Sequence, residues 1–211
     1  MSRSFFSPQS GSTQHELSYA KDDFLINEVV KLDQEYFGEA GYNYQNLKDL
    51  TTQYSQGTFT LINKYTGKLI LTISLWPIDS SLYRSMIYDG FSELNIEASQ
   101  ILPQGSGQYW WISALLETPE SYKTNPANIN LFLLSVFDIW SRQFNTINDR
   151  AISLVASGFS PQGVGLLEGF NFAKADSSTN IYYLEGTVQK IKMLLEQKAR
   201  GTLGASRTAR R

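Results

Sequence analysis

The stretch YWWISALL at Tyr109–Leu116 is a nearly continuous apolar run near the middle of the chain. Such a run is typical of a strand buried on both faces of a sheet. A polar segment with two prolines follows over residues 118–128, and a broad apolar face then predicts a long helix over residues 129–144. A short β-branched strand is expected over residues 151–156. The rest of the chain is organised around this strand, loop, helix and strand.

A second helix and a hairpin are expected next. Ser160 is a good N-cap residue and Pro161 stands at the first helical position, so a helix is expected over residues 162–169. The strands of the hairpin are expected over residues 172–175 and 181–184.

The N-terminal half predicts two packing helices followed by a hairpin. Apolar residues recur at helical spacing over residues 22–37, and a shorter helix is expected over residues 45–54. Alternating apolar residues predict hairpin strands at 58–62 and 68–76. Pro77 is expected to end the second of these strands, because proline cannot donate to the ladder.

These elements predict one domain between two less structured ends. Residues 1–21 are expected to be a flexible leader, residues 22–186 the domain, and residues 187–211 an amphipathic helix with a basic tail. The segment 78–108 is long for a connection, and such loops are often functional or mobile. No secretory signal or membrane-spanning run is visible, so a cytoplasmic protein without a membrane partner is expected.

Two residue types are nearly absent, which narrows the chemistry. The chain has no cysteine, which excludes disulfides, thiolate metal sites and cysteine nucleophiles. Its single histidine, His15, falls in the expected leader, which argues against a Ser-His-Asp triad and a histidine-ligated zinc site. Acid–base chemistry is therefore expected from carboxylates, tyrosines or lysines, or from the substrate itself, without a metal.

Charge is distributed unevenly along the chain. From Lys190 onward the chain has seven Lys and Arg residues and one acidic residue, Glu196, which gives a net charge of +6. Because the whole chain has a net charge of −2, the preceding 189 residues have a net charge of −8. A basic tail on an acidic body can attract an anionic partner or simply keep the chain soluble. The tail has no interleaved aromatic residues, so nucleic-acid binding is only weakly indicated.

The order of the expected elements and two sequence motifs resemble those of a known protein family. The segment Leu166–Phe172, LLEGFNF, resembles the pattern Leu-Tyr-Glu-Lys-x-Gly-Phe of the GCN5-related N-acetyltransferase superfamily. Members of that family open their coenzyme-binding helix with Gln/Arg-x-x-Gly-x-Gly/Ala, and Asn125, Asn128 and Asn130 stand at these positions here. The resemblance covers roughly residues 24–185, and both motifs are degenerate.

This resemblance implies an α/β (α+β) fold with a mixed, mainly antiparallel twisted sheet flanked by helices. It also implies acetyl-CoA as the coenzyme, with its pyrophosphate at a helix N-terminus where unpaired N–H groups and the helix dipole favour anions. Asparagine tolerates left-handed backbone, but its Cβ and amide would crowd phosphate oxygens more than glycine would. The implied coenzyme-binding residues are Ala114, Leu115, Leu116, Lys123, Asn125, Asn128, Ile129 and Asn130.

The acid and base of such a reaction are harder to assign. Glu117, at the end of the central strand, is the leading candidate for the base that deprotonates an amine through water, although it can equally be a solvent-facing strand end. Many family members use a tyrosine as the acid where this chain has Leu167, which cannot donate a proton. Tyr122 or Tyr182 could replace it from another direction. Two weaker candidates for the base are Ser113 and Glu168.

An acceptor pocket is expected near the end of the hairpin. Trp76 precedes the irregular segment, and Tyr83 and Tyr88 within that segment could close over a substrate. The resemblance then implies an acyl-CoA-dependent N-acyltransferase acting on a small-molecule or peptide amine. The alternative is a binding or assembly module that keeps the fold without the chemistry, because fold alone does not imply function.

Overall fold

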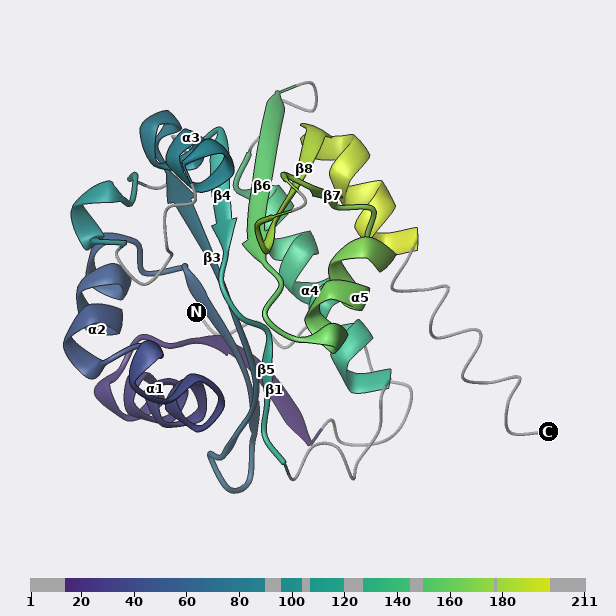
Figure 1. Ribbon diagram of the computed structural model, residues 1–211. Helices are drawn as coiled ribbons and strands as arrows, with labels where there is room; N and C mark the ends of the chain where they lie inside the picture. Colours follow the sequence, from purple (N-terminus) through teal and green to yellow (C-terminus); the bar gives the residue numbers. More distant parts are fainter. Residues whose placement is uncertain are drawn as a thin grey trace.

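A single mixed β-sheet separates two groups of helices in the computed structural model (Figure 1). The structure describes residues 14–89, 96–103, 107–119, 127–144, 150–176 and 178–197. The sheet has eight strands in the order β1-β2-β3-β4-β6-β8-β7, with β5 pairing β3. The strands are β1 (His15–Tyr19), β2 (Thr58–Asn63), β3 (Leu69–Ile78), β4 (Tyr109–Ile112), β5 (Leu116–Glu117), β6 (Ala151–Ser157), β7 (Ala173–Lys174) and β8 (Ile181–Thr187).

Helices lie on both sides of this sheet (Figure 1). The helices α1 and α2 lie on one side, and α4, α5 and the helix over residues 188–197 lie on the other. Of the described strand pairs, β4–β6 is parallel and the others are antiparallel. The mixed, mainly antiparallel sheet flanked by helices that the sequence predicts is thus confirmed. The helices are α1 (Asp23–Phe37), α2 (Tyr44–Gln53), α3 (Ser80–Tyr88), α4 (Ala127–Arg142) and α5 (Pro161–Gly169).

Side-chain caps fix where four of the helices begin. Asp22, Asn43, Asp79 and Ser160 each accept a hydrogen bond from the backbone N–H three residues further on. Such a bond satisfies one of the unpaired donors of the first turn. The N-cap at Ser160, with Pro161 following it, is confirmed. None of the described helices has both the length and the hydropathy needed to cross a bilayer.

The first strand corrects the sequence analysis. Residues 1–21 were expected to form a flexible leader, but His15–Tyr19 form β1 and pair with β2. All five residues of β1 are half-buried, which explains the weak signal, because the strand lacks a clear alternation of buried and exposed positions. Residues 1–13 lie outside the described part of the chain.

Pro77 does not end the second hairpin strand, contrary to expectation. It lies inside β3, which continues to Ile78. Leu75 donates its N–H to the carbonyl of Gly57, the residue that precedes β2. The pairing of β2 with β3 therefore ends at this point, before β3 reaches Pro77. The backbone of Pro77, two residues after Leu75, faces the same edge of β3 as the backbone of Leu75. There the carbonyl of Pro77 accepts the N–H of Leu102 at 2.8 Å. Among the described residues, no strand on that side needs a donor from Pro77, so proline is tolerated there.

Aromatic side chains fill the core between the sheet and α4. Trp110 makes edge contacts with Trp140 and Phe144, with each pair of ring centroids 5.6 Å apart. Tyr54, at the end of α2, reaches the same cluster and lies 6.0 Å from Trp110. Tilted and edge-on pairs of this kind stabilise a core beyond their buried area. This cluster joins α2, β4 and α4.

The helix over residues 188–197 packs against α4. Thr187 accepts the N–H of Lys190 at its start. Lys192 donates to the carboxylate of Asp138 on α4 at 2.8 Å, and Arg142 binds the same carboxylate. Val188 and Ile191 are buried, which fits the amphipathic helix expected from the sequence.

The helix α5 offers a prediction about stability. Gly165 lies in the interior of this helix, and a Cβ added there would meet nothing within 4 Å. Gly165→Ala is expected to raise the free energy of unfolding by about 0.5–1 kcal/mol, because glycine has more conformational entropy to lose in a helix. Urea unfolding measures this change. A destabilised variant would show that the space around Gly165 is filled.

Candidate functional site

The apolar run at the centre of the chain does not form one strand. β4 ends at Ile112 opposite Leu75, and the chain next pairs as β5 with Leu116 opposite Thr72. The chain thus advances four residues from Ile112 to Leu116, while β3 advances only three, from Leu75 to Thr72. One extra residue on one side of a pair is the signature of a β-bulge. Of the described strands, β5 pairs only with β3, whereas β6 continues beside β8 to Ser157. The parallel strands β4 and β6 therefore part after Ile112.

Backbone donors are left unpaired at the point where the strands part. Ser113 still donates its N–H to the carbonyl of Ser74 on β3 at 3.0 Å. Within the described residues, the N–H groups of Ala114 and Leu115 donate to no partner. Both residues are half-buried. Partly buried, unpaired N–H groups are uncommon and are available to a ligand.

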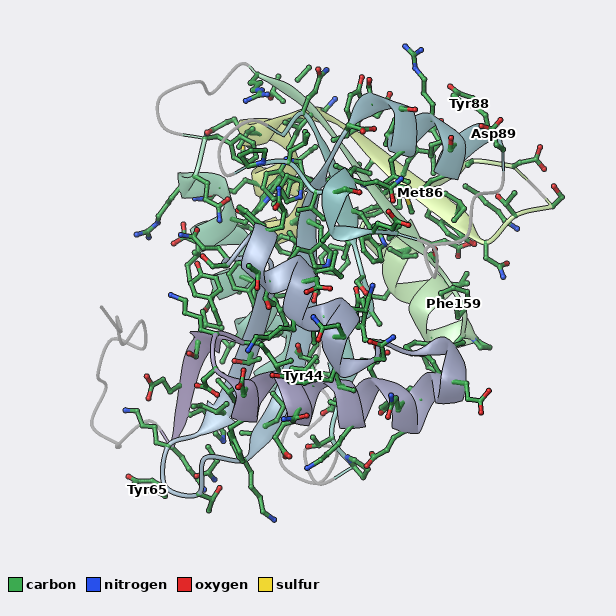
Figure 2. The ribbon with its side chains drawn as sticks, turned by 90° about the vertical axis from the view of Figure 1, so that its left-hand side faces the viewer. Tyr44, Tyr65, Met86, Tyr88, Asp89 and Phe159 are labelled. Atoms are coloured by element: carbon green, nitrogen blue, oxygen red, sulfur yellow. The ribbon has the colours of Figure 1, made fainter. Side chains whose placement is uncertain are left out.

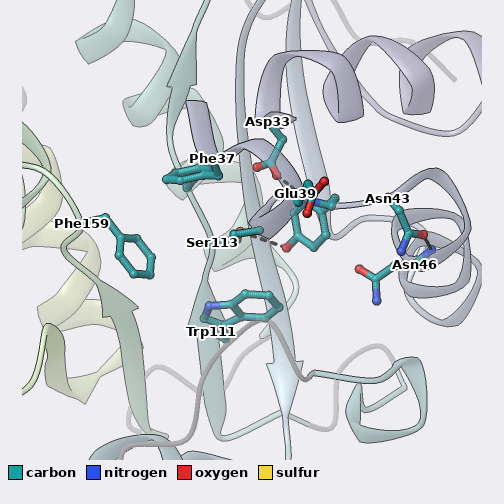
Figure 3. A pocket seen from close by; sticks show the side chains of 12 residues that line it. Asp33, Phe37, Glu39, Asn43, Asn46, Trp111, Ser113 and Phe159 are labelled. Carbon is teal, nitrogen blue, oxygen red and sulfur yellow. Dashed lines mark hydrogen bonds between the residues drawn. The ribbon is translucent and has the colours of Figure 1, made fainter. Parts of the chain in front are cut away.

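A cavity of about 350 Å³ opens on the side of the sheet that carries the α1–α2 connection. This volume is at the lower end of the range for small-molecule sites. Figure 3 shows the cavity between the end of α1, the sheet at Ser113 and Trp111, and Phe159 beyond β6. Its lining residues are Asp33, Phe37, Glu39, Ala40, Gly41, Tyr42, Asn43, Asn46, Trp111, Ser113, Ala114 and Phe159.

Asp33 is the buried charged group of this cavity. Its residue surface is only 4% exposed, and its Oδ2 accepts the backbone N–H of Tyr42 at 2.6 Å. Burial raises the pKa of Asp33 to about 6, against the smaller lowering by that hydrogen bond. A Cβ at Gly41 would overlap with the carboxylate, so only glycine lets the chain pass this close. A carboxyl group with this pKa can exchange protons near neutral pH.

Tyr42 and Ser113 connect the two sides of the cavity. The hydroxyl of Tyr42 donates to the Oγ of Ser113 at 2.9 Å, beside the bulge. The ring of Tyr42 lies 6.4 Å from that of Trp111, which is buried in the sheet. Tyr42 thus joins the α1–α2 connection to β4 and also donates its N–H to Asp33.

The mouth of the cavity carries two phenylalanines from distant parts of the chain. Phe37 ends α1 and is half-buried, whereas Phe159 follows β6 and is 57% exposed. Their rings make an edge contact with centroids 5.9 Å apart. An exposed aromatic side chain at a cavity mouth can cover a bound ligand.

Glu117, the base expected from the sequence, lies outside this lining. It is half-buried in β5 opposite Leu71, and its carbonyl oxygen accepts the hydroxyl of Tyr36 at 2.7 Å. Ala114, at the bulge, does line the cavity. The assignment of Glu117 as base stays a prediction.

The expected coenzyme residues are only partly described. Leu115 is half-buried at the bulge and Leu116 is buried in β5. Ile129 and Asn130 are half-buried in the first turns of α4, and the backbone of Asn128 belongs to the same helix. Lys123 and Asn125 lie outside the described residues.

Two residues considered for the catalytic acid in the sequence analysis lie on α5 and β8. Leu167 is half-buried on α5, and Tyr182 is buried in β8 opposite Ala156. Tyr122 lies outside the described residues.

The three aromatic residues expected to line the acceptor pocket do not converge on the cavity. Trp76 is completely buried in β3, and its indole N–H has no partner among the described residues. Tyr83 stacks on Tyr109 with centroids 4.5 Å apart and donates to Glu185 at 3.0 Å. Tyr88 is 79% exposed on α3, apart from Phe159 in Figure 2.

The sequence analysis missed Asp33, although a signal was present. Asp33 stands four residues from both Val29 and Phe37, so it falls on the apolar face of the predicted helix. A carboxylate on such a face is costly to bury and points to a function. Phe159 carried no local signal, because its position beside Phe37 arises from the tertiary fold.

Known structures share this fold. No protein-family model matches the sequence, and no curated protein matches it either. The loading GNATL domain of CurA from Lyngbya majuscula aligns with a TM-score of 0.53 and 13% identity, over 83% of this chain and 98% of that one. Ard1 from Thermoplasma volcanium aligns with a TM-score of 0.52 and 9% identity, over 83% and 98%.

A third structure was determined with a ligand. The GNAT-like decarboxylase GphF, in complex with isobutyryl-CoA, aligns with a TM-score of 0.53 and 10% identity, over 82% of this chain and 99% of that one. At identities this low, the structural alignments show a shared fold and nothing finer. The chain has the fold of the GCN5-related N-acetyltransferases, so the fold that the resemblance in the sequence implies is confirmed.

Within the described part of the chain, no three His, Cys, Asp or Glu side chains lie close enough together to hold a metal ion.

Proposed function

We propose that this chain is an acyl-CoA-dependent N-acyltransferase whose thioester lies where β4 and β6 part. The observation that carries the proposal is the pair of unpaired N–H groups of Ala114 and Leu115 at the bulge. Donors held in this way can stabilise the negative charge that develops on a carbonyl oxygen during acyl transfer. The GNAT-like decarboxylase that shares the fold binds an acyl-CoA.

The surroundings of the bulge suit the acyl chain and pantetheine arm of the coenzyme. Leu115 lies against the core while staying half-buried, as do Val164, Leu166 and Leu167 of α5. No side chain of α5 is fully buried. This partly exposed apolar surface can lose water to a ligand that passes between the sheet and α5.

The start of α4 is the proposed position of the coenzyme's phosphates. The first N–H groups of a helix are unpaired and the helix dipole is positive there, which favours an anion. Ile129 and Asn130 lie in the first turns of α4 and are half-buried. We assign the sequence-predicted residues Lys123, Asn125 and Asn128 to the same proposed subsite.

The bound acyl-CoA would supply an activated thioester, and the amide bond to the acceptor nitrogen forms as the C–S bond breaks and the thiol is released. Asp33 takes the role of proton acceptor, because it lines the cavity and its pKa is about 6. The ammonium gives its proton to Asp33, either directly or through water, before the nitrogen attacks. Glu117 remains the alternative base and would act through water from β5.

Release of free CoA thiol tests the proposed reaction. The protein is incubated with acetyl-CoA and a panel of primary amines, and the thiol is followed with a thiol reagent, which the cysteine-free chain cannot consume itself. Thiol release that depends on the amine and saturates with it is expected. Coenzyme binding without amine-dependent release from any acceptor would instead assign the chain to a binding module.

A further inference from the structure

The lining of the cavity has an uneven distribution of charge. Asp33 and Glu39 are its acidic residues, and no lysine, arginine or histidine is among the twelve residues that line it. Asp33 is buried, whereas Glu39 is exposed at the rim. Low-dielectric walls strengthen the attraction between a buried carboxylate and a cation. The cavity is therefore suited to a positively charged ligand.

Aromatic rings form the other part of the lining. Trp111, Phe37, Tyr42 and Phe159 all contribute to it. In Figure 3, Trp111 and Phe159 lie across the cavity from Glu39 and Asp33. Rings attract a cation through their faces and also stack on flat apolar groups. The acidic groups on one side and the rings of Trp111 and Phe159 on the other match a ligand with an ammonium at one end and a flat body at the other.

We propose that this cavity binds a small arylalkylamine, with its ammonium at Asp33 and Glu39 and its aromatic ring against Trp111 and Phe159. As an account of the acceptor, this inference rests on the proposed function; as an account of binding, it stands on the cavity alone. A volume of about 350 Å³ suits a small molecule. An aliphatic polyamine offers the rings a second ammonium but no flat group on which they can stack.

Three matched ligands test the inference by titration of the intact protein. The probes are 2-phenylethylamine, its neutral analogue 2-phenylethanol, and the aliphatic diamine putrescine. Calorimetry gives the affinities, and the fluorescence of the protein's four tryptophans, of which Trp111 lines the cavity, provides a second readout. The amine is expected to bind at least about tenfold more tightly than the alcohol, which lacks the ammonium, or the diamine, which lacks the ring. Equal binding of the alcohol, or tighter binding of putrescine, would overturn the inference.

Two variants place the ligand in this cavity. Phe159→Ala removes an exposed ring, so the fold should persist, and it is expected to weaken 2-phenylethylamine binding about five- to tenfold. Tyr65→Ala removes an exposed ring at the β2–β3 turn, apart from Phe159 in Figure 2, and should leave binding unchanged. Loss of binding in Tyr88→Ala with none in Phe159→Ala would move the site to α3 and overturn the inference.

The outcome is separable from that of the proposed function. Amine binding is measured without coenzyme, and coenzyme binding without amine. Amine binding with no acyl transfer would uphold the cavity assignment and refute the reaction. Acyl transfer to other amines, with no binding of 2-phenylethylamine, would uphold the reaction and refute the assignment.

Discussion

Asp33→Asn is expected to slow amine acylation by about 10²–10⁴-fold while making the protein more stable at pH 8. The loss of rate follows from removing the proposed proton acceptor. The gain in stability follows from removing a buried charge, because burial raises the pKa of Asp33 to about 6. Asparagine keeps an oxygen that can accept the N–H of Tyr42, so the local backbone should be retained.

The pH dependence has a definite sign. The pKa of Asp33 is higher in the folded protein than the ordinary value of 3.8, so the folded state binds more protons between these two values. Stability contributed by this group is therefore full below about pH 4, falls as the pH rises to about 6, and stays low above that. At about 1.4 kcal/mol per pKa unit, the difference is on the order of 2–3 kcal/mol.

Urea unfolding at pH 4.5 and pH 8 measures both effects on stability. The wild-type protein should lose stability between these two values, and Asp33→Asn should lose less. Asp89→Asn, at the exposed end of α3, is the matched control and should change stability by less than about 0.5 kcal/mol. An Asp33→Asn protein that is less stable at pH 8 and keeps its full rate would contradict both roles of Asp33.

Gly57→Ala is expected to destabilise the fold by about 2–4 kcal/mol. A Cβ at Gly57 would overlap with the six-membered ring of Trp76, and that indole is completely buried. A rigid ring in a close-packed core cannot move aside as the end of a flexible side chain can. The carbonyl of Gly57 also accepts the N–H of Leu75 at 2.7 Å, so a backbone shift would disturb β3.

Gly165→Ala is the matched control for this substitution. Both variants add one methyl group, but the space around Gly165 is open within 4 Å. Urea unfolding should show a large loss of stability in Gly57→Ala and a small gain in Gly165→Ala. Equal effects would show that the contact between Gly57 and Trp76 is not tight.

Local chemistry made much of the fold predictable. Ser160 followed by Pro161 marked the start of α5 because their side chains act within one turn of helix. The LLEGFNF segment also carried a backbone signal, since Asn171 adopts a positive φ of 63° at the motif's glycine position. Asparagine is one of the few residues other than glycine that reach this conformation readily.

Features that depend on pairing could not be predicted in the same way. The apolar run Tyr109–Leu116 looked continuous, because a bulge changes the partners of a strand without changing its hydrophobicity. Pro77 looked like a strand end because only the tertiary structure shows that its side of β3 needs no donor.

The cavity was hidden for a related reason. Asp33 and Trp111 are separated widely in the sequence, and the sheet brings them into one lining. The aromatic residues near the end of the hairpin favoured Trp76 as part of a pocket, but the fold places it in the core. Hydrophobicity predicts burial well but does not separate a core indole from one that borders a cavity.

Acetyl-CoA titration by calorimetry tests the central claim most directly, namely that a coenzyme thioester lies where β4 and β6 part. Saturable one-to-one binding is expected, and coenzyme at 100 times its dissociation constant should raise the free energy of unfolding by about 2.7 kcal/mol. No heat of binding and no stabilisation at millimolar acetyl-CoA would contradict the assignment of the unpaired Ala114 and Leu115 donors to an acyl-CoA.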